Sequence, residues 1–281
     1  MTTINGEDWV RKDFDVLLDL AQRLIRIQAE VPLSSQDPCL NDAQVLGIKM
    51  FRHLIAMRGV AQEVVVTKDD EIVAHHIDHS STKVLARAAY ETFLVFSFIF
   101  RCQPQVGLFR HNAWRLGGLS DRQEFEVKSE EGRRKLQVER AQIEELQKSI
   151  VAHREYESYS EKGKKKLLDG DWRIGKSWND LAEIAGFERN FSRQVYSYFC
   201  GYSHSSYLSV LQISQARTFE EQQMLSHTSF DIANSILGHF AKAYCEIFPS
   251  TEPELYSNPV ALECARRWQM RSSPQPNKAV D

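Results

Sequence analysis

Apolar residues recur at three- and four-residue steps along most of the chain, which is the spacing that places them on one face of an α-helix. The first such stretch covers residues 7–30, and the second begins at a cap at Asn41 or Asp42 and ends near Gly59. Residues 63–67, EVVVT, have an extended pattern without an evident pairing partner. Further helices are predicted over residues 177–186, 191–211, 219–248 and 261–270.

The most apolar stretch of the chain begins at Asp69 or Asp70, either of which can cap a helix, and ends near Arg101 ahead of Pro104. Residues 92–100, TFLVFSFIF, are apolar on every side of that helix. A soluble protein surrounds such a helix with neighbours, so we predict that it lies at the centre of the fold. The segment is about half as long as a bilayer span, and we therefore expect no membrane association.

Residues 121–169 are the most highly charged part of the chain, with 12 acidic and 12 basic side chains around a thin apolar seam. This pattern is typical of helices with a solvated surface. We predict a charged helical excursion over residues 121–170, which projects from the core or pairs with a partner copy and which could dock a protein partner. The seam consists of Leu136, Ile143, Leu146 and Ile150.

Together these patterns predict an all-α protein, a multi-helix bundle with a charged helical excursion and a disordered C-terminal tail. Residues 1–68 are expected to form an N-terminal helical pair packed on the bundle. Residues 69–270 are expected to form the bundle itself, with the charged insertion at 121–170. Residues 271–281 have the composition of a disordered tail.

Composition narrows the classes of function. The 281 residues include 35 Lys+Arg and 38 Asp+Glu, a formal net charge of -3, which provides no broad positive field for non-specific nucleic-acid binding. The five cysteines form no C-x-x-C pair and indicate free thiols in a reducing compartment, so we expect a cytoplasmic protein. No phosphate-binding glycine loop, G-x-S-x-G elbow or paired metal-ligand motif is present, and we expect no cofactor and no bound metal.

Three histidines and an aspartate stand near the start of the predicted central helix: His75, His76, Asp78 and His79. On a helix His79 would share a face with His75 and with His76, and such a pair can bind a metal when other ligands come from elsewhere. Neither H-E-x-x-H nor E-x-x-H accompanies them, so we interpret them as a surface or interhelix histidine cluster.

An arginine and a glutamate interrupt the apolar pattern of the same helix. Arg87 and Glu91 are four residues apart and therefore share a face. Charges in such surroundings lose several kcal/mol of hydration unless they are paired. We expect the two side chains to form an internal ion pair or, alternatively, to line a polar pocket in which Arg87 binds an anion.

A second group of polar side chains lies within residues 193–210. At about 100° per residue, Arg193, Ser197, Cys200 and His204 form one stripe, and Tyr196, Ser203 and Tyr207 form the adjoining one. Gly201 permits a kink that would bring Ser203 and His204 into a cleft, where a histidine can act as a general acid or base. A core histidine bonded to Glu91 is the alternative interpretation.

The sequence R-A-A-Y-E at residues 87–91, followed about a hundred residues later by Trp178, Tyr196 and the Y-S-H of 202–204, resembles a bacterial family of all-helical proteins of unknown function. That family is itself similar to the HEPN (higher eukaryotes and prokaryotes nucleotide-binding) superfamily. The resemblance covers residues 70–245. It implies a helical bundle and a role in handling nucleotides or RNA, including antiphage defence and toxin–antitoxin systems.

The same resemblance implies which residues matter. Arg87 and Glu91 match the family's early Arg/Glu pair, and its later polar helix is matched by Tyr196, Ser203 and His204. HEPN ribonucleases have an arginine and a histidine with four to six residues between them. Here ten residues separate Arg193 from His204, about 16 Å along an uninterrupted helix, so a ribonuclease would require the cation of Arg87.

These patterns are consistent with three functions. The first is a binding or regulatory protein with a polar pocket for a nucleotide, an anion or a partner segment, formed by Arg87, Glu91, Tyr196, Ser203 and His204. The second is a metal-independent ribonuclease in which His204 is the general base, Arg87 or Arg193 stabilises the phosphate charge and Glu91 orients them. The third is a structural component of a larger assembly that docks through residues 121–170. Homo-oligomerisation is expected by analogy with other helical bundles.

Overall fold

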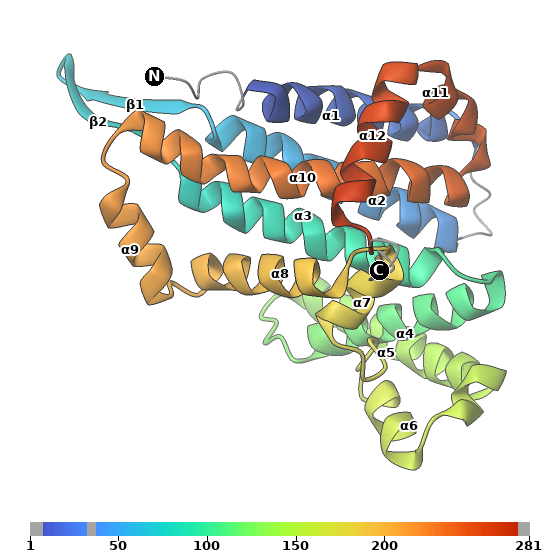
Figure 1. Ribbon diagram of the computed structural model, residues 1–281. Helices are drawn as coiled ribbons and strands as arrows, with labels where there is room; N and C mark the ends of the chain where they lie inside the picture. Colours follow the sequence, from blue (N-terminus) through green and yellow to red (C-terminus); the bar gives the residue numbers. More distant parts are fainter. Residues whose placement is uncertain (1–7, 33–37, 275–281) are drawn as a thin grey trace, which may run out of the picture. The chain divides into compact units, whose positions relative to one another are not determined.

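The computed structural model describes residues 8–32 and 38–274 and is built almost entirely from helices (Figure 1). The all-α prediction is confirmed. Over the described residues the only sheet is a two-stranded antiparallel one. The elements are α1 (Asp8–Ala29), α2 (Pro38–Val60), β1 (Glu63–Lys68), β2 (Glu71–Ile77), α3 (His79–Phe100), α4 (Pro104–Gln123), α5 (Glu130–Val151), η1 (Arg154–Ser158), α6 (Glu161–Leu168), α7 (Trp178–Ala185), α8 (Arg189–Ser203), α9 (Tyr207–Gln215), α10 (Phe219–Ile247), η2 (Pro249–Thr251), α11 (Glu252–Ser257) and α12 (Pro259–Ser272).

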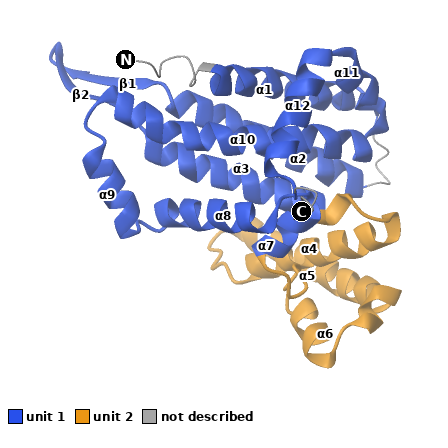
Figure 2. Ribbon diagram, viewed as in Figure 1, with its two compact units in different colours: residues 1–97, 178–281 blue, residues 98–177 orange. Residues whose placement is uncertain are grey.

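The chain divides into two compact units, shown in different colours in Figure 2. Unit 1 consists of residues 1–97 and 178–281, and unit 2 of residues 98–177. The boundary between them falls inside α3.

In unit 1 the core is arranged around α10, which runs through the middle of this unit in Figure 1. Aromatic rings from two sides pack on it: Phe14 of α1 meets Phe230 edge to face, and Phe96 of α3 packs against Phe240. Residues 92–97 of α3 are all buried, as the sequence predicted. The helix is central because its second half has no polar face to turn to solvent.

The N-terminal helix is fixed to the C-terminal helix by one carboxylate. Asp13 of α1 accepts hydrogen bonds from the indole Nε1 of Trp268 at 2.7 Å and from Nη2 of Arg267 at 2.6 Å. The second helix begins at Pro38 rather than at Asn41 or Asp42, because proline needs no N–H bond in the first turn of a helix.

The expected helix start at Asp69 or Asp70 is wrong. Both residues have positive φ, 51° and 64°, and they form the turn of the β1–β2 hairpin. Two consecutive left-handed residues match the right-handed twist of a tight hairpin, and aspartate tolerates that conformation. The segment 63–67 therefore has a partner, and α3 begins ten residues later, where Asp78 Oδ1 accepts a hydrogen bond from the N–H of Ser81 at 2.9 Å.

The predicted helix over residues 191–211 is two helices. α8 ends at Ser203, Ser205 has φ +51°, and Ser206 caps α9. Gly201 permits this reversal, because the Ser206 N–H donates to its carbonyl at 2.8 Å and a Cβ at Gly201 would lie 2.9 Å from Ser206 Oγ. His204 is thereby placed at the C-terminal end of α8.

The C-terminal helix begins two residues before the predicted start at residue 261. Asn258 accepts a hydrogen bond from the N–H of Ala261, and Pro259 is the first helical residue. The helix continues to Ser272, so the first two residues of the predicted tail 271–281 are helical, and residues 275–281 lie outside the described part of the chain. No helix among the described residues is long and apolar enough to cross a membrane.

Unit 2 contains the charged segment, and its apolar seam is covered within the chain. Leu146 and Ile150 of α5 are buried together with Phe109, Ala113 and Leu116 of α4 and Leu167 of α6. Leu146 and Ile150 of the seam therefore belong to the core of this unit, Ile143 packs against that core, and Leu136 is half-buried. A partner bound through residues 121–170 stays a prediction that rests on charge alone.

Truncating this seam should destabilise unit 2. Leu146 is 7% exposed, and Leu146→Ala is expected to lower the free energy of unfolding of the unit by about 2–4 kcal/mol, measured by chemical denaturation. The matched control is Val138→Ala on the same helix, where the side chain is 60% exposed and the expected change is within about 0.5 kcal/mol. Equal stability of both variants would contradict a buried seam.

Candidate functional site

The most distinctive polar cluster in unit 1 lies between α3 and α8. Nε of Arg87 donates to Oε1 of Glu91 at 2.9 Å, so the predicted i, i+4 pair forms. The other side of the guanidinium faces α8, where Nη2 lies 3.4 Å from the Tyr196 hydroxyl and Nη1 lies 3.5 Å from Nε2 of His204. We call these four residues the Arg87 cluster.

The charges of the Arg87 cluster are partly shielded from water. The side chains of Arg87 and Glu91 are 18% and 26% exposed. Burial alone would lower the pKa of Arg87, but the hydrogen bond and the charge of Glu91 raise it above its ordinary value, so the guanidinium stays charged. Burial, followed by the charge of Glu91, raises the pKa of Tyr196, which therefore remains a neutral phenol that can donate a hydrogen bond.

Aromatic rings border the cluster on one side. Trp178 of α7 stacks on Tyr196 with ring centroids 6.2 Å apart and planes inclined by 26°. Cζ of Arg87 lies 5.3 Å from the centroid of Tyr196, within the range of a cation–π contact. The arrangement combines a cation, a flat aromatic surface and, in His204, an exposed imidazole.

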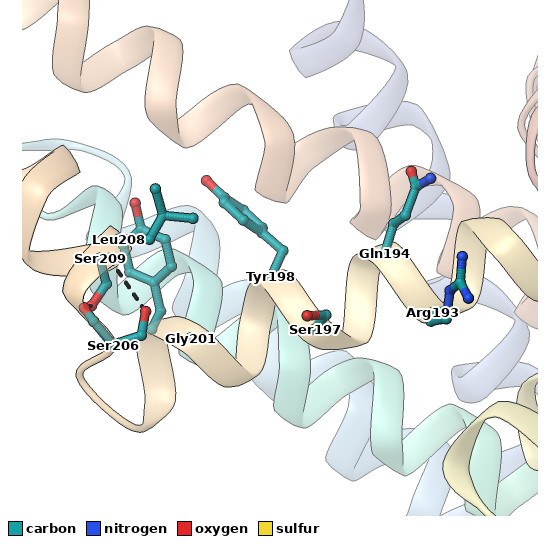
Figure 3. Close-up of a pocket in the computed structure, with 9 residues that line it drawn as sticks. Arg193, Gln194, Ser197, Tyr198, Gly201, Ser206, Leu208 and Ser209 are labelled. Carbon is teal, nitrogen blue, oxygen red and sulfur yellow. Dashed lines mark hydrogen bonds between the residues drawn. The ribbon is translucent and has the colours of Figure 1, made fainter.

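Two predicted residues lie outside this cluster. Ser203 donates from Oγ to the carbonyl of Phe199 at 3.1 Å, so its hydroxyl is used within α8. Arg193 is exposed and lines a separate groove on α8, shown in Figure 3. The cation next to His204 is therefore Arg87 and not Arg193, because ten residues of nearly continuous helix hold Arg193 away from the end of α8.

The groove, which we call the α8–α9 groove, has a volume of about 590 Å³. One face of α8 forms its length, and the first turn of α9 closes one end (Figure 3). Its lining residues are Arg193, Gln194, Ser197, Tyr198, Gly201, Tyr202, Ser206, Leu208 and Ser209.

Sequence reasoning missed a second cation on α3. Lys83 is fully buried, and its Nζ donates to the carbonyls of His79 at 3.0 Å and Leu225 at 2.8 Å and lies 4.6 Å from the ring centroid of Tyr202. Burial lowers the pKa of Lys83 to about 7. The sequence contained a signal for this buried cation, because Lys83 precedes Arg87 by four residues and so shares a face with it on the same apolar helix.

A buried hydroxyl network fixes α8 against α3 next to the Arg87 cluster. The hydroxyl of Tyr90, a fully buried side chain, donates to Ser192 Oγ at 2.9 Å, and Ser192 Oγ donates to Asn179 Oδ1 of α7 at 3.3 Å. Ser192 thus occupies a buried position as a satisfied polar group. This network holds the helix that carries Tyr196 and His204 in register with Arg87.

The histidines near the hairpin do not share a helical face. His75 and His76 lie on β2, where consecutive side chains point to opposite faces, and only His79 is helical. His75 contacts Glu63 on β1 and packs against Phe219. Among the described residues no group of three or more His, Cys, Asp or Glu side chains is placed to hold a metal ion.

These observations define an all-helical protein in which a paired arginine on one apolar helix meets a tyrosine and a histidine from a second helix. A family model described as "Family of unknown function (DUF5677)" matches residues 66–221, which is more than half of the chain, and the protein belongs to this family. The matched residues include the whole Arg87 cluster. No curated protein and no solved structure matches the chain.

Proposed function

We propose that the Arg87 cluster binds a phosphate-bearing ligand of the nucleotide or RNA type. The observation that carries this proposal is the geometry of Arg87. Glu91 holds its Nε at 2.9 Å, whereas the Nη contacts to Tyr196 and His204 are 3.4 and 3.5 Å long, at the limit of hydrogen bonding. These donors are oriented but weakly used, so an anionic oxygen would gain charge-assisted hydrogen bonds there.

The neighbouring side chains suit the rest of such a ligand. Trp178 and Tyr196 provide a stacked aromatic surface on which a base can lie. His204 is exposed at the end of α8, so a ligand can reach the cluster from solvent. Glu91 fixes the guanidinium of Arg87 and offsets its positive charge. The pair therefore attracts an anion weakly at long range, and a ligand must contact Arg87 directly to bind. The HEPN resemblance adds nucleotide or RNA handling in bacterial defence or toxin–antitoxin systems to this proposal.

A specific distance favours metal-independent RNA cleavage as a second candidate function. Nη1 of Arg87 lies 3.5 Å from Nε2 of His204. In this candidate function these two residues serve as the arginine–histidine pair that the spacing of Arg193 and His204 does not provide. In this reaction His204 would accept the proton of the ribose 2′-hydroxyl, whose oxygen attacks the adjacent phosphorus, and Arg87 would stabilise the added negative charge. The 5′-oxygen leaves and takes a proton from water, which gives a 2′,3′-cyclic phosphate and a 5′-hydroxyl.

The proposal is tested with a labelled single-stranded RNA and with adenosine 5′-monophosphate, in the presence of a metal chelator. Arg87→Met is expected to weaken binding of both probes at least tenfold, because it removes about 1.4 kcal/mol or more of charge-assisted hydrogen bonding. His204→Ala should weaken the binding of both probes by a smaller factor than Arg87→Met does. The matched control is His76→Ala, an exposed histidine on β2, which should bind as the wild type does.

The outcomes separate the two candidate functions. Cleavage that survives the chelator and is lost in His204→Ala would establish the ribonuclease. Binding without cleavage would support a binding or regulatory protein. Folded Arg87→Met and His204→Ala variants with unchanged affinity for both probes would contradict any ligand at the Arg87 cluster.

A further inference from the structure

The short helix α9 turns its apolar side chains to solvent. Its one buried residue is Ser209, at 3% exposed, whereas Tyr207, Leu208, Val210 and Ile213 are 79%, 52%, 53% and 49% exposed. Helices of soluble proteins ordinarily bury their apolar stripe and expose their polar one. Contiguous exposed apolar side chains mark interaction surfaces. We call these four residues the α9 face.

The α9 face lies within the longest uncharged part of the chain. Residues 194–216 contain no Lys, Arg, Asp or Glu, although such residues make up 26% of the whole sequence. Without charges, this surface provides no electrostatic complementarity to a partner of opposite charge. An uncharged surface is, however, well suited to contact a copy of itself.

A hollow lies beside this protruding surface. The α8–α9 groove, about 590 Å³ in volume, is bounded by the rings of Tyr198 and Tyr202, has Gly201 in its lining and is shared with Leu208 of the α9 face (Figure 3). The most exposed large side chain of the α9 face, Tyr207, immediately precedes Leu208 in the first turn of α9. A protruding ring and a hollow bounded by two tyrosine rings therefore occur together on one surface.

We propose that the α9 face and the α8–α9 groove form a contact between two copies of this chain, related by a two-fold axis, in which Tyr207 of each copy enters the groove of the other. In a two-fold contact the same patch lies on both sides, so a charged patch would repel itself, and this patch carries no acidic residue and only Arg193 at one end of the groove.

The available area is sufficient. Four such side chains and the groove walls provide on the order of 500 Å² from each copy, which reaches the total of roughly 1,000 Å² that a specific interface requires. Tyrosine is also among the residue types that contribute most energy to interfaces when they fill a pocket. The contact does not depend on the ligand of the Arg87 cluster, so the two proposals fail or succeed separately.

The test is the mass of the full chain in solution, measured by light scattering after size-exclusion chromatography. The wild type is expected at about 65 kDa, twice the chain mass of 32.4 kDa. Tyr207→Glu and Val210→Glu should each give the monomer mass, because both copies would bring an unpaired carboxylate into the contact. Both positions are exposed, so the fold is retained, as circular dichroism would verify.

The matched control is Val260→Glu, which places the same charge on α12 at a residue that is 68% exposed. This variant should remain a dimer. The proposal is overturned if the wild type is monomeric at every concentration measured, in which case the α9 face serves a different partner. It is equally overturned if a wild-type dimer persists unchanged in both α9 variants.

Discussion

Replacing Lys83 with methionine is expected to stabilise the protein at pH 6 by about 1–4 kcal/mol, the range found when buried ion pairs are replaced by apolar side chains of similar volume. Lys83 is fully buried and lacks a carboxylate within hydrogen-bonding distance, and its ammonium contacts the carbonyls of His79 and Leu225 and the ring of Tyr202. These contacts reduce the cost of burying the charge without removing it.

The stabilisation by Lys83→Met depends on pH, because the proton on Lys83 is bound more weakly in the folded chain than in the unfolded chain. Burial lowers the pKa of Lys83 from 10.5 to about 7, so between these values the unfolded chain binds a proton that the folded chain does not. The stability contributed by this group is therefore present at high pH, falls as the pH drops from 10.5 to 7 and is constant below 7. The difference in stability between Lys83→Met and the wild type should accordingly shrink between pH 7 and pH 9.

Chemical denaturation of both proteins from pH 6 to pH 9 measures this difference. Groups that do not interact with Lys83 cancel, whereas burial and then the Lys83 charge lower the pKa of His79, so His79 also differs between the two proteins. Lys242→Met is the matched control, because the Lys242 side chain is 63% exposed on α10 and its loss should change stability by about 0.5 kcal/mol or less at every pH. If Lys83→Met were less stable than the wild type at pH 6, the carbonyl and ring contacts would outweigh the desolvation of the ammonium.

Adding a single methyl group at Gly238 is expected to destabilise unit 1 by about 1–3 kcal/mol. Gly238 is buried in α10 where α12 crosses it, and a Cβ there would lie 2.8 Å from the carbonyl oxygen of Ala265 and 3.3 Å from Cβ of Trp268. Neither backbone nor Cβ atoms can rotate away, so α12 would have to move. That movement would also disturb the bonds of Asp13 to Trp268 and Arg267.

Thermal unfolding of Gly238→Ala would show this loss as a lower Tm. Gly59→Ala is the matched control in α2, since a Cβ at Gly59 would meet no atom within 4 Å. Alanine is the better helix former by about 0.8–1 kcal/mol, so the control should be at least as stable as the wild type. A Gly238→Ala variant that is as stable as Gly59→Ala would show that α12 does not pack closely on α10.

Local spacing was sufficient to predict part of the candidate site. Arg87 and Glu91 pair because four residues separate them on a helix whose existence the apolar pattern already indicated. The same rule applies to Lys83, one turn earlier, but the sequence does not show that its ammonium would donate to carbonyls and lie against a tyrosine ring, with Asp78 acting on it only through its charge.

Local signals also had two valid interpretations at some positions. Aspartate is both a good helix cap and a good left-handed turn residue, so the pair at 69 and 70 was consistent with a helix start and with a hairpin turn. The pairing of β1 with β2 decided between them, and this moved His75 and His76 from a helix to a strand.

The sequence by itself determined the helical class, the central position of the apolar helix that became α3, and the Arg87–Glu91 pair, because each depends on residues within about one or two turns of one another. Only the tertiary structure decided that His204 and Tyr196 lie against Arg87, that Arg193 lies apart from them in a groove, and that Leu146 and Ile150 of the apolar seam in the charged segment belong to an internal core. Those arrangements depend on where α8 ends and on which helices pack together. They arise from contacts between residues far apart in the chain, which periodicity within one helix does not encode.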